Sequence, residues 1–171
     1  PRLDGWDKRV WSIGHRNIQG AALDTASGEL WTAEHGARGG DEINNPQPGL
    51  NYGWPVITYG IDYSGAKIGE GTHKEGMEQP VHYWDPSIAP SGLMIYSGDK
   101  FPKWQGNYFV GALAGAAVSR LVYSDGKFVS EERILQDLGE RIRDVVQGPD
   151  GLIYLLTDSF DGRVLRLKIS E

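Results

Sequence analysis

Three segments of the sequence share one pattern, in which a turn glycine is followed by a short apolar run. The segments are SGELWTAEHG, QGNYFVGALAG and PDGLIYLLTD, which align on Gly28, Gly106 and Gly151. Their spacings are 78 and 45 residues, so one skipped unit gives a mean period of about 41 residues. That period is typical of a four-stranded β-propeller blade. The repeat therefore predicts an all-β chain that covers about three blades.

The composition favours the same fold class. The 171 residues include 24 Gly, nine Pro, six Trp, eight Tyr and four Phe. Such a composition suits an all-β chain, because glycine and proline form tight turns and aromatic side chains pack well on sheets. We expect strands at residues 21–23, 93–96, 118–123 and 164–169, and a hairpin over 121–129 with a type I′ turn at Asp125-Gly126. Residues 1–171 are interpreted as one partial propeller domain, with a long loop-rich insertion at 37–92.

Charge and hydropathy exclude several classes of partner. A net charge of −6 argues against nucleic acid, which requires a basic face, and no apolar run is long enough for membrane insertion. The absence of cysteine excludes disulfides and thiolate metal sites and leaves the compartment open. Because the chain opens on Pro1 and its first methionine is Met77, we expect a processed or cut product.

Three blades do not close a ring, since a propeller has at least about four. The open sheet faces therefore need a partner, either a missing half of the propeller or a second copy of the chain. For the chain alone we predict a homodimer in which two three-bladed arcs cover each other.

Two polar segments precede predicted strands. GHRNIQG offers Arg16, Asn17 and Gln19 as donors for an anionic ligand, although composition alone favours a polar turn that pairs with neighbouring backbone. In RIRD, alternation along a strand places Arg141 and Arg143 on the same side, so the two guanidinium groups could converge on one anion. The alternative is a solvated edge strand.

A third segment, EHGARGGDEINN, combines a glycine-rich turn with oxygen-bearing side chains. Backbone carbonyls and carboxylates of this kind suit Ca²⁺, and the alternative is an Asx-rich surface loop. The nearby aromatic residues either pack against the sheet or wall a flat ring; they are Trp54, Tyr59, Tyr83 and Trp84. We assign no role to His73 or His82.

Together these segments resemble the glucose/sorbosone dehydrogenase family, in its soluble aldose sugar dehydrogenase branch, which uses pyrroloquinoline quinone (PQQ). The segments that carry the resemblance, in the family's order, are GHRNIQG, LWTAEHGARGGDEIN, NYGWPVITYGIDYSG, APSG, FVGAL and RIRDVVQGPDGLIYLLTD. The resemblance implies a six-bladed propeller with the cofactor in a crevice on its top face.

The resemblance also implies roles for individual residues. Those that match cofactor-contacting positions are Arg16, Asn17, Gln19, Arg141 and Arg143. The backbone carbonyls of Gly36 and Ala37 match those that hold a Ca²⁺ ion bridging to PQQ, and Glu42 with the backbone of Tyr52 matches a second, structural calcium site. The implied reaction is oxidation of an aldose at C1 to the lactone, with hydride passing to the quinone and electrons leaving for an external acceptor. The implied location is periplasmic or secreted.

The sequence departs from the family's pattern in two ways, which leave other functions open. Ala114 stands where relatives often carry a lysine, and the family's histidine base belongs to an N-terminal half that these residues do not include. A non-catalytic propeller binding module, or an inactive fragment, is therefore the alternative. A calcium-dependent lactonase is a third hypothesis, but it requires carboxylates that converge on one ion, and the sequence offers one Asp-Glu cluster.

Overall fold

The computed structural model describes residues 5–169 and is almost entirely β-structure. The strands are β1 (Ile18–Leu23), β2 (Leu30–Glu34), β3 (Asp41–Asn44), β4 (His82–Trp84), β5 (Pro90–Ile95), β6 (Tyr108–Ala112), β7 (Ala117–Ser124), β8 (Lys127–Ile134), β9 (Ile142–Gln147), β10 (Ile153–Thr157) and β11 (Val164–Arg166). Helical structure within 5–169 is limited to two 3₁₀ turns, η1 (Pro102–Trp104) and η2 (Gln136–Leu138).

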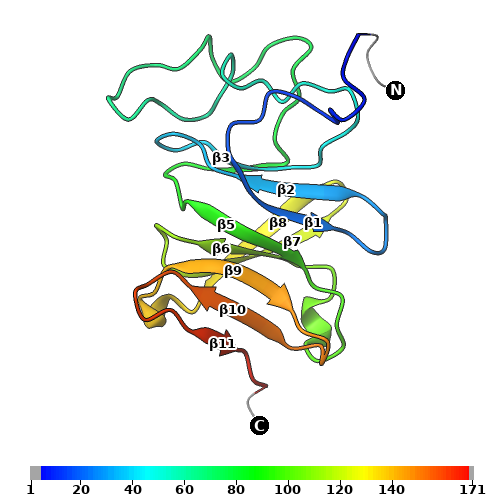
Figure 1. The fold of residues 1–171 in the computed structure, drawn as a ribbon, viewed down its shortest axis with the longest axis vertical. Coiled ribbons are helices and arrows are strands. Elements are labelled where there is room, and N and C mark those ends of the chain that lie inside the picture. Colours follow the sequence, from blue (N-terminus) through cyan, green and yellow to red (C-terminus); the bar gives the residue numbers. More distant parts are fainter. Residues whose placement is uncertain (1–4, 170–171) are drawn as a thin grey trace.

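The strands form three antiparallel sheets in chain order, β1-β2-β3-β4, β5-β6-β7-β8 and β9-β10-β11. The first strands of the sheets lie side by side, because β1 contacts β5 and β5 contacts β9. These three inner strands run in the same direction, so their N-terminal ends lie at one rim of the molecule (Figure 1). This arrangement confirms the predicted all-β propeller fold with about three blades.

Two hydrophobic cores join the blades. The alternation of side chains along β6 separates them, since Tyr108 and Val110 face the first blade and Phe109 faces the third. The first core packs Trp31 and Ile43 against the second blade. The second consists of Met94, Tyr96, Phe109, Val118, Ile142, Val145, Ile153 and Leu155. Burial of these side chains fixes the angle between neighbouring sheets, and therefore the positions of the inner strands.

Glycines allow the inner strands to approach closely. A Cβ atom on Gly20 of β1 would overlap the carbonyl oxygen of Ser91 in β5, and one on Gly92 would overlap the side chain of Asp144 in β9. The hydroxyl of Ser91 also donates to the carbonyl of Ile142 at 2.7 Å. The N-terminal ends of β1, β5 and β9 therefore lie in close contact, with glycines where the neighbouring strands approach and the Ser91 hydroxyl linking β5 to β9.

The expected strands are present, with corrected boundaries. Residues 21–23 and 118–123 lie inside β1 and β7, and 93–96 runs one residue past β5. The run at 164–169 is shorter than expected, because β11 ends at Arg166. The hairpin at 121–129 is confirmed, since Asp125 and Gly126 both have positive φ angles, as a type I′ turn requires.

The boundaries predicted for the insertion, residues 37–92, are too wide. It contains β3, β4 and the start of β5, so the irregular stretch is residues 45–81, between the third and fourth strands of the first blade. Figure 1 shows this stretch beyond β3, on the side of the first blade away from β5. Sequence analysis missed β3 because it is short and polar, although Asp41 and Asn44 in it are fully buried. It missed β4 because this strand has only three residues.

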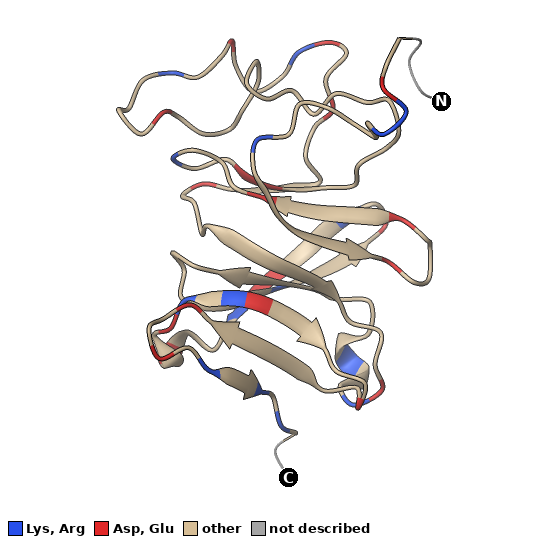
Figure 2. Cartoon of the chain, viewed as in Figure 1, with Lys and Arg blue, Asp and Glu red and all other residues tan. Residues whose placement is uncertain are grey.

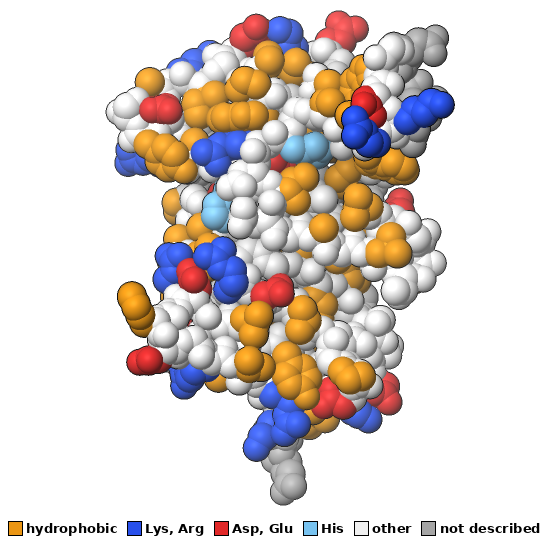
Figure 3. All heavy atoms as spheres, in the orientation of Figure 1, with side chains coloured by type: hydrophobic (Ala, Val, Ile, Leu, Met, Phe, Trp, Pro, Cys, Tyr) orange, Lys and Arg blue, Asp and Glu red, His pale blue; other side chains and the backbone are white. Residues whose placement is uncertain are grey.

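The third blade leaves an apolar face uncovered. Val146 is 44%, Leu156 39% and Val164 69% exposed, and strand pairing places all three on the same face of β9-β10-β11. Figure 3 shows apolar side chains at the surface over β9 and β10. None of the described helical turns has the length or hydropathy to cross a membrane.

Candidate functional site

The predicted cofactor segments meet at the rim where the inner strands begin. Arg16 and Asn17 directly precede β1 and Gln19 lies within it, while Arg141 and Arg143 flank the first residue of β9. Between them lies the start of β5, and Ser91 links it to both neighbours. The fold therefore brings together two segments that are far apart in sequence, as expected from their positions before strands.

Glu34, at the end of β2, holds the segment before β1. Its carboxylate accepts hydrogen bonds from the backbone N–H of Arg16 at 2.7 Å and from the side chain of Asn44 at 2.8 Å, and it pairs with Nδ1 of His15 at 3.0 Å. The His15 ring also stacks on Tyr52 with centroids 4.8 Å apart. Because the Glu34 side chain is only 4% exposed, these contacts fix the backbone of the segment.

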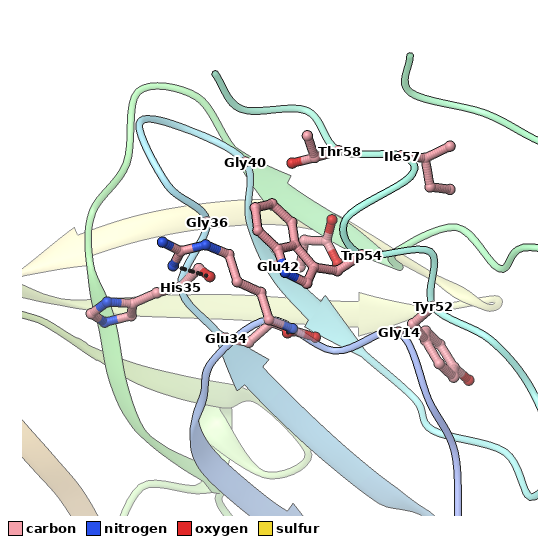
Figure 4. Close-up of a pocket in the computed structure, with 11 residues that line it drawn as sticks. Gly14, Glu34, His35, Gly36, Gly40, Glu42, Tyr52, Trp54, Ile57 and Thr58 are labelled. Carbon is pink, nitrogen blue, oxygen red and sulfur yellow. Dashed lines mark hydrogen bonds between the residues drawn. The ribbon is translucent and has the colours of Figure 1, made fainter. Parts of the chain in front are cut away.

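The side chain of Arg16 extends from this anchored backbone toward the rim. Its guanidinium donates to the carbonyl of His35 at 3.1 Å, the bond dashed in Figure 4, and lies over the Trp54 ring at 5.2 Å from the centroid. Asn17 and Gln19 point to the same side, since the Gln19 amide donates to Asn17 Oδ1 at 2.8 Å. Both amides are exposed and have further donors available for a ligand.

The loop from Gly36 to Gly40 offers carbonyl oxygens to a cation. Among the hydrogen bonds between described residues, none is accepted by the carbonyl oxygen of Gly36 or Ala37. Gly36 cannot be another residue without rearrangement, because a Cβ atom there would overlap the carbonyl groups of Gly39 and Gly40. Free carbonyls in a constrained loop are the kind of ligand that Ca²⁺ prefers.

Asp41 braces this loop and is therefore not a free ligand. Its buried carboxylate accepts the backbone N–H of Gly36 at 2.9 Å and, through the other oxygen, that of Ile88 at 2.8 Å and the hydroxyl of Ser87 at 2.7 Å. Asp41 thus ties the carbonyl loop of the first blade to the segment that leads into β5.

Glu42 and Tyr52 are among the residues that line the same small cavity. Figure 4 shows its lining, which includes Gly14, Glu34, Glu42, Tyr52 and Thr58. The cavity has a volume of about 10 Å³ for the centre of a water molecule, which is room for one water molecule or one ion. Burial, with a smaller contribution from the neighbouring Glu34 carboxylate, raises the pKa of Glu42 to about 7, although the hydrogen bond from Asn44 lowers it. A cation in this cavity would relieve the repulsion between the two carboxylates.

Arg141 and Arg143 converge, as alternation along β9 predicts. Both donate to Oδ2 of Asp158, Arg141 through Nη2 at 2.7 Å and Nε at 3.0 Å, and Arg143 through Nη2 at 3.1 Å. Hydrogen bonding by Arg141, with the charges of both arginines, lowers the pKa of Asp158. The two arginine side chains remain 53% and 44% exposed, and Figure 2 shows basic and acidic segments side by side on β9.

The remaining residues singled out from the sequence lie in other environments. His73 contacts Tyr59 on the exposed insertion, and His82 packs edge-on against Trp84 at 4.6 Å. Of the four aromatic residues considered as a wall, Trp54 lies under Arg16, while Tyr59 and Tyr83 stack on each other at 3.8 Å. Trp84 is buried between the first two blades. Ala114 is exposed in the turn after β6.

Sequence reasoning missed Glu34, Ser91 and Asp158. Each acts through a partner that is distant in sequence, and a single carboxylate or hydroxyl carries no local pattern. The available signal was weak: Glu34 is the charged last residue of β2, and Asp158 directly follows β10. Among the described residues, no group of three or more His, Cys, Asp or Glu side chains is arranged to hold a metal.

The comparisons with known proteins agree with this geometry. The model of the glucose/sorbosone dehydrogenase family matches residues 2–166. The chain is 52% identical over 160 residues to the aldose sugar dehydrogenase YliI of Escherichia coli K12, an alignment that covers 92% of this chain and 43% of that protein.

Two solved structures extend the comparison. A crystal structure of a glucose dehydrogenase superposes with a TM-score of 0.94 and 53% identity, covering 98% of this chain and 49% of the other. The PQQ-bound aldose sugar dehydrogenase of Streptomyces coelicolor superposes with a TM-score of 0.72 and 27% identity, covering 92% and 44%. The chain spans a little under half the length of these relatives.

Proposed function

Because the chain belongs to the glucose/sorbosone dehydrogenase family, we propose that its rim site binds PQQ and that the protein oxidises aldose sugars at C1 to lactones. The observation that carries this proposal is the convergence of Arg141 and Arg143 beside the segment of Arg16 and Asn17. PQQ is a polycarboxylate, and fixed guanidinium groups are the donors best suited to carboxylates. A relative crystallised with PQQ supports the choice of ligand.

The residues present fit this cofactor and its metal. The half-buried side chain of Arg16 and the exposed side chains of Arg141 and Arg143 would bind the carboxylates, and the amides of Asn17 and Gln19 would orient the rings. The carbonyls of Gly36 and Ala37 would hold a Ca²⁺ ion at the cofactor, and the cavity beside Glu42 and Tyr52 would hold a structural one. When bound, PQQ accepts the hydride of the sugar, and an external acceptor removes the electrons.

The chain's own contribution to the reaction is binding and orientation. In this proposal, the anchored backbone of Arg16 and the braced loop at Gly36 hold donors and carbonyls close to each other for one ligand. Two of the described histidines are engaged within the fold, since His15 is held by Glu34 and His82 is packed against Trp84. Because the family resemblance places the histidine base in the N-terminal half, we assign proton removal from the sugar to the part of the relatives' propeller that this chain does not span. We further propose a periplasmic or secreted location.

A titration with PQQ tests this proposal. The purified protein is titrated with PQQ in the presence of Ca²⁺, and binding is followed by cofactor absorbance and by thermal shift. We expect saturable, calcium-dependent binding that weakens at least tenfold in Arg143→Ala and in Arg16→Ala, since each removes a charged donor. Arg9→Ala is the matched control, because Arg9 is 89% exposed and, among residues 5–169, forms an ion pair with Asp7 alone. Equal losses in all three variants, or no binding by wild type, would refute the PQQ site.

A non-catalytic binding module is the second candidate, favoured by exposed Ala114 in place of a cationic contact. Restoring the cation discriminates the two functions. If the protein is a dehydrogenase, Ala114→Lys should tighten PQQ binding and leave turnover measurable once the remaining blades are supplied. PQQ binding that never supports sugar oxidation under those conditions would favour the binding module.

A further inference from the structure

Asp158 is the shared hydrogen-bond acceptor of Arg141 and Arg143. A single oxygen, Oδ2, accepts three hydrogen bonds, two from Arg141 and one from Arg143. The side chain of Ile142 between them is fully buried, so both arginines extend from the same side of β9 toward this one atom. Without a shared acceptor, two like charges on long side chains would separate in solvent.

The position of Asp158 is itself fixed. Its backbone N–H donates to the carbonyl of Arg141 at 2.8 Å, which continues the pairing of β9 with β10 by one residue. Next to it, Thr157 bonds Arg163 twice, through its own N–H at 3.0 Å and through its hydroxyl at 2.8 Å. The sheet therefore fixes the backbone of Asp158 beside Arg141, within reach of both arginine side chains.

The arginines keep donors for a ligand. Among the hydrogen bonds between described residues, Nη1 of Arg141 and both Nε and Nη1 of Arg143 make none. A ligand carboxylate could bind these atoms while Asp158 stays in place. With one carboxylate between two guanidinium groups, the cluster carries one net positive charge, so it still attracts an anion.

From this geometry we infer that Asp158 is a positioning residue, which gathers Arg141 and Arg143 into one binding unit for a carboxylate of the cofactor. The identity of the ligand rests on the proposed function. The role of Asp158 in holding Arg141 and Arg143 together does not depend on it. The opposing possibility is that Asp158 competes with the ligand for the same donors. The two differ in sign, because removing a competitor tightens binding and removing a support weakens it.

Variants at Asp158 separate these possibilities. We expect Asp158→Ala to weaken PQQ binding about tenfold, although it raises the local positive charge, because the free arginine side chains must then be ordered by the ligand. Asp158→Asn should lose less, since its amide oxygen still accepts a hydrogen bond. Asp161→Ala, on the same loop, is the charge-matched control and should bind like wild type. Unchanged or tighter binding by Asp158→Ala would overturn the inference, as would an equal loss in Asp161→Ala.

A coupling experiment shows whether Asp158 acts through the arginines. In a protein that already carries Arg141→Ala and Arg143→Ala, adding Asp158→Ala should change PQQ affinity less than twofold. A full additional loss would mean that Asp158 supports the fold generally rather than the pair.

A second readout does not depend on PQQ. The Nε–H groups of Arg141 and Arg143 should give ordered NMR signals in wild type, and those signals should show increased fast motion in Asp158→Ala. If wild type fails to bind PQQ but this change is seen, the ligand assignment fails and the positioning role stands. If the arginine side chains are equally mobile in both proteins, the positioning role fails.

Discussion

The backbone N–H of Arg16 donates a 2.7 Å hydrogen bond to the buried carboxylate of Glu34, which joins the segment before β1 to the end of β2. Removing this carboxylate leaves several buried donors without an acceptor. We expect Glu34→Ala to lower the free energy of unfolding by about 3 kcal/mol, measured by denaturant titration. Glu75→Ala, which truncates an exposed glutamate on the insertion, should change it by less than about 0.5 kcal/mol. Comparable values for the two variants would mean that Glu34 does not anchor the segment.

The carbonyl loop should be intolerant of any side chain at Gly36. A Cβ atom there overlaps backbone carbonyls, which cannot rotate away as a flexible side chain would. We predict that Gly36→Ala destabilises the fold by roughly 1–3 kcal/mol and removes calcium-dependent stabilisation. Gly71→Ala is the control, because a Cβ atom on Gly71 meets no atom within 4 Å. A Gly36→Ala protein with normal stability would show that the loop is less constrained than described.

These two sites also show how far the sequence could lead. Turn glycines and apolar runs predicted the blades, because inter-blade burial imposes them locally, as in Tyr108 and Val110 of β6. Alternation predicted the convergence of Arg141 and Arg143. The carboxylates that hold the site could not be predicted, since Glu34 finds Arg16 through tertiary structure alone. Strand β3, which contains Glu42, was not predicted for a related reason. Its sequence DEIN is as polar as that of a loop.

Stability should decrease at mildly acidic pH because of His82. Burial lowers the pKa of His82, opposed by the weaker effect of Glu131, so the folded state disfavours the proton that the unfolded state binds. The stabilisation is therefore present above about pH 6.5 and is lost as the pH falls below it. We expect His82→Phe to flatten the dependence of unfolding free energy on pH between about 6.5 and 5, whereas exposed His73→Phe leaves it unchanged. An unaltered slope in His82→Phe would assign the pH dependence to other groups.

Removing calcium should lower thermal stability. A ligand present at 100 times its dissociation constant stabilises the folded state by about 2.7 kcal/mol, so EDTA should reduce the melting temperature by roughly 5 °C or more. Glu42→Gln should melt lower without EDTA and respond little to it, because Glu42 lines the small cavity. Glu70→Gln, on the exposed insertion, should retain the full response. A melting temperature that EDTA leaves unchanged would remove the calcium assignment.

The uncovered face of the third blade should promote self-association of the chain when it is produced alone. Val146, Leu156 and Val164 form an apolar surface that further blades would otherwise cover, and a second copy is the occupant we expect. Light scattering at micromolar concentration should report a dimer, and Leu156→Glu should shift it toward monomer. A wild-type monomer with a cooperative melt would exclude this arrangement.

The common direction of the inner strands has a practical consequence for handling the molecule. The hairpin turns at Ser27 and at Asp125 lie at the ends of β1 and β7 that point away from the rim (Figure 1). A fluorophore, an affinity tag or an electrode surface attached at either turn would leave the arginines and the carbonyl loop facing solution. Immobilisation through these turns is therefore the orientation to choose for a sensor built on this scaffold.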